Sequence, residues 1–236
     1  MNNLNPHISV DCVVFGYDKD GLSVLLISRD NKNKEKYKLP GSLIVLKEGL
    51  QHSAQRTLSE LTGIQDLFLK QFGVFDDPKR LITSDDLEWL RNTSGLNDIE
   101  RVVTIAYYSL LNIEDYQSLH EAARWFHVHK LPKLIFDHEK IVQVGLKTLQ
   151  NELLTEPHGY ELLPEKFSLN QLQKLYETIL DIPIDNRNFR KKINRLDYII
   201  PLNEFQKGVS HKPAKLHVFD KEKFKEFKNN NIGLVI

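Results

Sequence analysis

Hydrophobic and polar positions alternate along the first half of the chain in a way that predicts strands before helices. Two β-branched runs, at 8–16 and 22–28, flank the polar segment 17–21, which ends in glycine and is typical of a hairpin turn. The same reasoning predicts further strands at 65–75, 101–112 and 125–128.

Helical periodicity replaces this alternation in two segments, 51–62 and 138–154. In the first, Ala54, Leu58 and Leu61 recur at i, i+4 and i+7, so they form one apolar face. Gly63 then provides the stop signal that commonly follows a helix. Strands followed by a central helix and a terminal helix favour an α+β fold, with an α/β/α sandwich around a mixed sheet.

A polar segment at 78–100 interrupts the strand pattern and reads as an insertion. Ser84, Asp85 and Asp86 are residues that cap helices, and Gly95 is a stop signal, so a short helix is predicted between them. Of the two interpretations of the insertion, a solvated loop is favoured over a lid or dimer contact.

The carboxyl-terminal part predicts two consecutive helices, at 168–180 and 186–196, capped by Ser168 and Asp185. The second helix gathers Phe189, Ile193 and Leu196 on one face and basic residues on the other. Strands at 198–202 and 214–219 follow, joined by a polar loop that contains lysines. A helix, a turn, a basic helix and a basic hairpin together predict a winged helix-turn-helix.

The basic helix and hairpin predict a double-stranded DNA operator as partner, with a merely solvated basic surface as the alternative. Arginine and asparagine make bidentate contacts with guanine and adenine, whereas lysines attract phosphates. The predicted base-reading residues are Arg187, Arg190 and Asn194, and the remaining predicted DNA-binding residues are Lys191, Lys192, Lys207, His211, Lys212 and Lys215.

Charge and composition agree with this division. Residues 160–236 hold 14 basic against 10 acidic residues, whereas the preceding 159 residues hold 18 against 22. An excess of positive charge at one end is typical of an anion-binding domain. No apolar run approaches 18 residues, no signal-peptide pattern is seen, and the one cysteine is Cys12, so no membrane contact and a cytoplasmic location are expected.

Residues 39–64, LPGSLIVLKEGLQHSAQRTLSELTGI, keep the spacing of the Nudix box, G-x5-E-x7-R-E-U-x-E-E-x-G-U, where U is aliphatic. Ser42, Thr57 and Leu61 replace its first glycine and two of its glutamates. The positions in register are Glu48, Arg56, Leu58, Glu60, Gly63 and Ile64.

In the Nudix family three carboxylates at i, i+3 and i+4 share a helix face and bind Mg²⁺ or Mn²⁺. One of the three remains here, so we expect no metal, no cofactor and no catalytic residue, with Glu48 and Glu60 as vestiges.

With both halves considered, the chain resembles the Nudix-related transcriptional regulators of the NrtR/AraR type. Beyond the box, the segments that carry the resemblance are 100–108, 131–138, 162–169, 186–192 and 212–216. The resemblance implies a catalytically degenerate Nudix-like effector domain at 1–155 and a winged helix-turn-helix at 160–236. It also implies a homodimer whose operator affinity changes when a small metabolite, ADP-ribose or a sugar, binds the old substrate cleft.

Loss of the metal ligands favours a sugar over ADP-ribose, and Arg29, Lys38 and Arg101 are the candidate effector-binding residues beside the cleft. Two alternatives stay open. One is an active Nudix hydrolase that acts on a nucleoside diphosphate derivative through Glu60, Glu48 and carboxylates outside the box. The other is a metabolite-binding interaction module that does not bind DNA.

Overall fold

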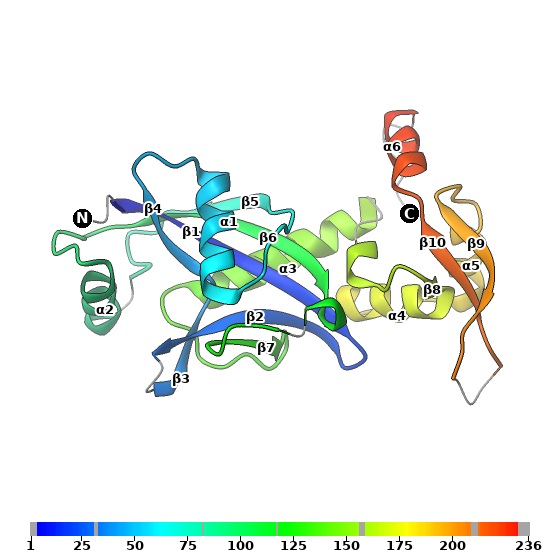
Figure 1. Ribbon diagram of the computed structural model, residues 1–236, viewed down its shortest axis with the longest axis horizontal. Coiled ribbons are helices and arrows are strands. Elements are labelled where there is room, and N and C mark those ends of the chain that lie inside the picture. The colour runs from blue at the N-terminus through cyan, green and yellow to red at the C-terminus, as the bar shows by residue number, and fades with distance from the viewer. Residues whose placement is uncertain are drawn as a thin grey trace. The chain divides into compact units, whose positions relative to one another are not determined.

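The computed structural model describes residues 4–30, 33–81, 83–116, 118–155, 159–208 and 212–230. The chain divides into two compact units (Figure 1). The amino-terminal unit comprises residues up to Gly16 and Leu22–Thr148, and the carboxyl-terminal unit comprises Tyr17–Gly21 and the residues from Leu149 onward. No helix among the described residues is long and apolar enough to span a bilayer.

A seven-stranded mixed sheet forms the centre of the amino-terminal unit, with strand order β3-β2-β1-β6-β5. Strand β4 pairs with one end of β1, and β7 pairs with β2. The strands are β1 (Leu4–Asp18), β2 (Gly21–Asp30), β3 (Asn33–Lys38), β4 (Gly41–Val45), β5 (Lys70–Phe75), β6 (Val103–Asn112) and β7 (Ala123–His127). The predicted 8–16 and 22–28 strands are confirmed as β1 and β2, whereas the strand predicted at 65–75 begins only at Lys70.

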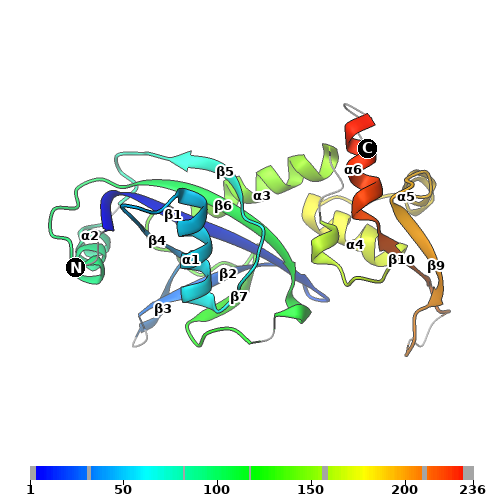
Figure 2. The ribbon, with the colours of Figure 1, turned by 45° about the horizontal axis from the view of Figure 1, so that its top comes forward.

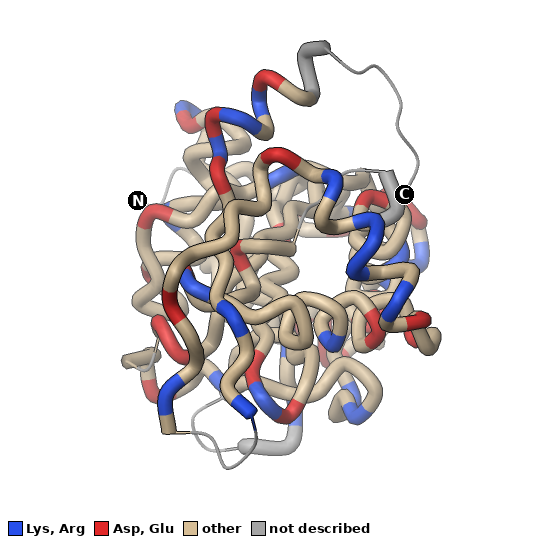
Figure 3. The backbone as a smooth tube through the Cα atoms, turned by 90° about the vertical axis from the view of Figure 1, so that its right-hand side faces the viewer, with Lys and Arg blue, Asp and Glu red and all other residues tan. Residues whose placement is uncertain are grey.

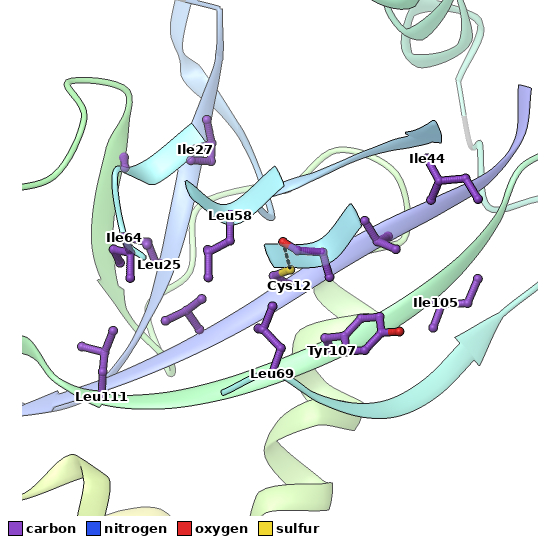
Figure 4. Packing of buried hydrophobic residues seen from close by; sticks show 14 residues of the cluster. Cys12, Leu25, Ile27, Ile44, Leu58, Ile64, Leu69, Ile105, Tyr107 and Leu111 are labelled. Atoms are coloured by element: carbon purple, nitrogen blue, oxygen red, sulfur yellow. Dashed lines mark hydrogen bonds between the residues drawn. The ribbon is translucent and has the colours of Figure 1, made fainter. Parts of the chain in front are cut away.

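Two helices cover the two faces of the sheet, because β1 is apolar on both sides. Helix α1 (Leu50–Thr62) places Ala54 and Leu58 in a buried cluster with Cys12. Figure 4 shows Leu58 and Cys12 within this cluster. The other face meets α3 (His138–Thr155), where a Cβ on Gly145 would lie 3.7 Å from the Phe15 ring. Neighbouring residues of β1 therefore contact opposite layers, as the α/β/α prediction requires.

The inserted segment forms a packed helix, α2 (Ser84–Ser94), so the favoured interpretation of a solvated loop is wrong. Its amino-terminal cap is Thr83, whose side chain accepts from the Asp86 N–H, and its carboxyl-terminal cap is Gly95. Leu87 and Leu90 pack against a buried cluster of Leu43, Ile99 and Val102. The capping and stop signals predicted the helix but gave no indication of the apolar surface beneath it.

The carboxyl-terminal unit contains the two predicted helices and a three-stranded antiparallel sheet of order β8-β10-β9. Strands β9 and β10 run side by side as a long hairpin (Figure 2). The elements are β8 (Phe167–Ser168), α4 (Leu169–Leu180), α5 (Asn186–Ile193), β9 (Ile199–Phe205), β10 (Lys215–Phe219) and α6 (Lys221–Asn230). Short 3-10 helices lie at Ile113–Asp115 and Tyr160–Leu162.

Both predicted caps are present: Ser168 and Gln171 form a capping box on α4, and the Asp185 side chain accepts from the Asn188 N–H at α5. Two details differ from prediction. Helix α5 ends at Ile193, so Leu196 lies beyond it, and helix α6 was not predicted at all.

Candidate functional site

A cavity of about 410 Å³ opens in the amino-terminal unit beside the Nudix-like box. Strands β1, β2, β3 and β4, helices α1 and α2, and the start of α3 all contribute to its walls. A volume of this size suits a small-molecule ligand. Its lining residues include four groups of interest: the altered box, a buried ionic cluster, the cations Arg29 and Lys38, and helix α2.

The altered box positions contact each other at the cavity wall. The Ser42 and Thr57 hydroxyls, which stand where the motif has glycine and glutamate, are hydrogen-bonded at 2.7 Å. Leu61 also lines the cavity. The Thr57 hydroxyl and the aliphatic side chain of Leu61 therefore replace two of the carboxylates that would bind a divalent cation.

The two carboxylates that remain in the box are tied to Arg56. Its Nε and Nη2 donate to the Glu48 oxygens at 2.8 Å each, and its Nη1 donates to Glu60 at 3.0 Å. The hydrogen bonds from Arg56 lower the pKa of Glu48 to about 2, assisted by the Ser53 hydroxyl. Among the described residues no group of three or more His, Cys, Asp or Glu side chains could hold a metal ion.

A buried ionic cluster forms another part of the cavity wall. Asp11 on β1 accepts from the Thr104 hydroxyl at 2.7 Å and lies 3.6 Å from Arg80 Nη2. Arg80, 4% exposed, also donates to both oxygens of Asp137, at 3.0 and 3.3 Å. Although burial raises the pKa of Asp11, its interactions with His138, Arg80 and Thr104 outweigh this and lower it. The charges are thus compensated within the protein.

His138 is the neutral member of this cluster. Its Nδ1 accepts from the Leu39 N–H at 2.9 Å, so the ring proton lies on Nε2, 3.5 Å from Asp11. Burial lowers the pKa of His138 to about 4, with the positive charges of Lys38 and Arg80 acting in the same direction. The imidazole is therefore uncharged at neutral pH.

Lys38 is a buried ammonium group at the cavity edge of β3. Its Nζ donates to the backbone carbonyls of Gly41 at 2.9 Å and Leu39 at 3.3 Å. Burial lowers the pKa of Lys38 to about 8, although nearby Asp11 opposes the shift. At neutral pH the group is still largely protonated, so it supplies positive charge to the cavity.

The predicted effector-binding residues have different locations. Arg29 and Lys38 both line the cavity, whereas Arg101 does not. The Arg101 side chain is exposed and donates from Nη2 to the Asp76 carbonyl at 2.9 Å. Sequence reasoning missed Arg80, His138 and Trp89 as cavity residues. Only Asp11 gave a local signal, because it is an isolated charge within an apolar strand.

The carboxyl-terminal unit presents its basic residues on α5. Asp181 turns the chain after α4 with φ of 55°, and Glu177 holds the turn by accepting the Ile184 N–H at 3.0 Å. Phe189 and Ile193 of α5 are buried, which directs the other face of the helix to solvent. Exposed on that side are Arg187, Arg190, Lys191 and Lys192, with Asn194 as the carboxyl-terminal cap (basic residues are blue in Figure 3).

The exposed cations of α5 differ in their partners. Arg190 Nη2 donates to the Asn170 side chain of α4 at 2.8 Å. Arg187, Lys191 and Lys192 make no ion pair with a carboxylate in the part of the chain that the structure describes. On the hairpin, Lys207, Lys212 and Lys215 are exposed, and His211 lies outside the described residues.

Comparisons with known proteins agree with this two-part architecture. Residues 159–219 match the family model of the NrtR DNA-binding winged helix domain. The chain is 29% identical over 223 residues to the ADPR responsive transcriptional repressor NtrR of Acinetobacter baylyi, covering 91% of this chain and 82% of the relative. It is 26% identical over 142 residues to the ADP-ribose pyrophosphatase of Methanocaldococcus jannaschii, covering 59% of this chain and 73% of the relative.

Solved structures show the same fold. Shewanella oneidensis NrtR complexed with a 27mer DNA superposes with a TM-score of 0.71 at 23% identity, over 92% of this chain and 95% of that one. A MutT/nudix family protein from Enterococcus faecalis gives a TM-score of 0.68 at 21% identity, over 92% and 87%. The chain thus shares the two-domain fold of these structures, a Nudix-like unit followed by a winged helix. Its resemblance to the NrtR type, predicted from the sequence, is confirmed.

Proposed function

We propose that this protein is a DNA-binding transcriptional regulator whose operator affinity is controlled by ADP-ribose or a close analogue bound in the cavity of the Nudix-like unit. The observation that carries the proposal is the exposed basic face of α5 on a winged-helix scaffold. A short helix with a buried apolar face and outward arginines suits insertion into the major groove.

On this proposal the basic residues divide their roles. Arg187, Arg190 and Asn194 read base edges, with Asn170 orienting the Arg190 guanidinium. The ammonium groups of the wing and of the α5 flank bind phosphates, which adds affinity but little sequence preference. Those phosphate-binding residues are Lys191, Lys192, Lys207, Lys212 and Lys215, with His211 as a further candidate.

The effector in this proposal is ADP-ribose rather than the sugar that the sequence alone favoured. The A. baylyi relative is described as ADPR responsive and matches 91% of this chain. Arg29 and Lys38 place two cations at the cavity, where a diphosphate could be held without a metal.

We further propose that the protein is a regulator and not a hydrolase. Attack on a diphosphate in the Nudix family needs a divalent cation. Here Thr57 and Leu61 stand in place of two of the three helix carboxylates, and the third, Glu60, is bound to Arg56. The role proposed for the chain also implies a cytoplasmic location, where DNA is accessible, and a homodimer that matches a two-fold operator.

The test begins with duplexes selected from a random pool by the full-length protein. Binding of the selected DNA is then measured by fluorescence anisotropy with and without ADP-ribose, and products are assayed with Mg²⁺ present. We expect selective DNA binding that ADP-ribose changes at micromolar concentration without being consumed. Turnover at around 1 s⁻¹ would support the hydrolase alternative, and failure to select any sequence would support the interaction module.

A further inference from the structure

The inserted helix α2, which lies outside the Nudix-like box, contributes the side chain of Trp89 to the cavity wall. Trp89, half-buried, lines the cavity together with Leu90, Thr93 and Ser94 of the same helix. Helix α2 is fixed from below by the Leu87 and Leu90 contacts and at both ends by Thr83 and Gly95. Trp89 is therefore part of the cavity wall and lies on a helix that is packed and capped.

Arg29 of β2 is bound to this helix by three contacts. Its Nη1 pairs with Asp86 at 3.2 Å, its Nη2 donates to the Asp85 carbonyl at 3.0 Å, and its guanidinium carbon lies 5.1 Å from the Trp89 ring centroid. The Arg29 and Asp86 side chains are only 11% and 9% exposed. Because a guanidinium has five N–H donors, two contacts leave others able to bind an anion.

Trp89 has further neighbours at the same corner of the cavity. Lys38 Nζ lies 5.9 Å from its ring centroid, and the Phe136 ring lies 6.1 Å away at an interplanar angle of 52°. Phe136 has φ of 55°, a backbone conformation that costs a bulky residue energy and is often found at binding sites. One corner thus combines two aromatic rings with two cations.

We propose that α2 is part of the effector site, with Trp89 as its specificity-determining residue and Asp86 as the positioning residue for Arg29. The ligand class is a nucleoside diphosphate: its base packs against Trp89 and Phe136, and its diphosphate binds Arg29 and Lys38. This inference rests on the proposed function, because it concerns the same cavity. A sugar without a phosphate would leave both cations without an anion to bind.

The experiment compares two ligands by calorimetry, ADP-ribose and ribose 5-phosphate, which lacks the base. Trp89→Ala should weaken ADP-ribose by about tenfold or more, since stacking on an aromatic side chain has this order of value. It should change ribose 5-phosphate affinity by less than about twofold, and Trp89→Phe should restore much of the ADP-ribose affinity. Trp125→Phe is the matched control, because Trp125 is not a lining residue.

A second measurement leaves α2 intact. With Trp125 replaced by Phe, Trp89 is the remaining tryptophan of the chain, and its fluorescence should change on addition of ADP-ribose but not of ribose 5-phosphate. Asp86→Asn should weaken ADP-ribose binding several-fold, because a neutral amide holds the Arg29 guanidinium at the cavity less firmly than the carboxylate does.

The possible outcomes distinguish a failure of the proposed α2 site from a failure of the proposed regulatory function. Equal ADP-ribose affinity in wild type and Trp89→Ala would overturn the role of α2, as would equal losses for both ligands, and either would leave regulation by ADP-ribose standing. ADP-ribose binding that depends on Trp89 but never alters DNA affinity would support the site and overturn the proposed function. Absence of ADP-ribose binding to wild type would overturn both.

Discussion

The arginines of the cavity and the basic residues of α5 are similar side chains, but they differ in whether a carboxylate of the protein is bound to them. In the amino-terminal unit Arg29, Arg56 and Arg80 each contact a carboxylate of the protein itself. On α5, Arg187 and Lys191 are exposed and, within the described residues, unpaired. Internal pairing fixes the geometry of a cavity and makes a ligand compete for each charge. Unpaired charges suit a partner that brings many phosphates at once.

The largest effect is expected from removing a cation that is paired with buried carboxylates. Arg80→Ala leaves Asp137 and Asp11 buried without their guanidinium, so the amino-terminal unit should lose about 3–5 kcal/mol of stability. Urea unfolding followed by tryptophan fluorescence measures it, because both tryptophans lie in that unit. Lys79→Ala, at the exposed neighbouring position, is the control and should change stability little. Equal stability of the two variants would show that the cluster does not need Arg80.

Acid should destabilise the same ionic cluster, because His138 becomes protonated while it is buried. The folded pKa of about 4 lies below the ordinary value of 6.5, so the unfolded state binds more protons between these values. Stability is therefore fully present above pH 6.5 and is lost as the pH falls toward 4, by up to about 3 kcal/mol. His138→Asn, which can still accept from the Leu39 N–H, should flatten the profile of unfolding free energy against pH. The exposed variant His129→Asn should not flatten it; if it does so equally, the assignment to His138 is wrong.

Removing an exposed cation of α5 should spare stability and affect binding instead. Arg190→Ala should cost about 1–3 kcal/mol in affinity for the selected operator and relax its sequence preference. Asn170→Ala should have a smaller effect of the same kind, because it removes only the hydrogen bond that orients Arg190. Anisotropy titrations on operator and scrambled duplexes measure both, with the exposed Lys147→Ala of α3 as a control. Unchanged operator affinity in Arg190→Ala would remove α5 from base recognition.

The smallest expected effect concerns the wing. Lys212→Ala should weaken operator and scrambled DNA alike and reduce the slope of log affinity against log salt by about one. Titrations at several salt concentrations give this slope directly. A loss confined to the operator would instead assign Lys212 to base reading.

Much of the fold was predictable because its signals are local. The β-branched runs, the Ala54–Leu58 stripe with Gly63, and the Ser168 and Asp185 caps each depend on a few neighbouring residues, and each is present in the structure. Helix α6 lacked such a signal. Its charged sequence contains only Phe224 and Phe227 to define a face, and both pack against Tyr198, which is distant in sequence.

The candidate site was less predictable because its walls come from segments far apart in the chain. Arg80 and Asp11 lie 69 positions apart, as their residue numbers show, yet they meet beside the cavity. Arg101 was chosen for its place at the start of a strand, but its side chain turns toward Asp76. Neither the docking of α2 nor the position of Trp89 follows from periodicity, since both depend on the apolar cluster of Leu43, Ile99 and Val102.

The hydrogen bond between Ser42 and Thr57 also bears on what a reversal of the altered box would require. Thr57 is 1% exposed, lines the cavity and is hydrogen-bonded to Ser42, so a glutamate placed there would break this hydrogen bond and bring a further negative charge to the cavity wall. Leu61 would still deny the metal its remaining ligand. Restoring either glutamate alone would therefore leave the carboxylate set of the box incomplete. We expect no hydrolysis of ADP-ribose by the Thr57→Glu variant alone, and measured turnover with Mg²⁺ would contradict this.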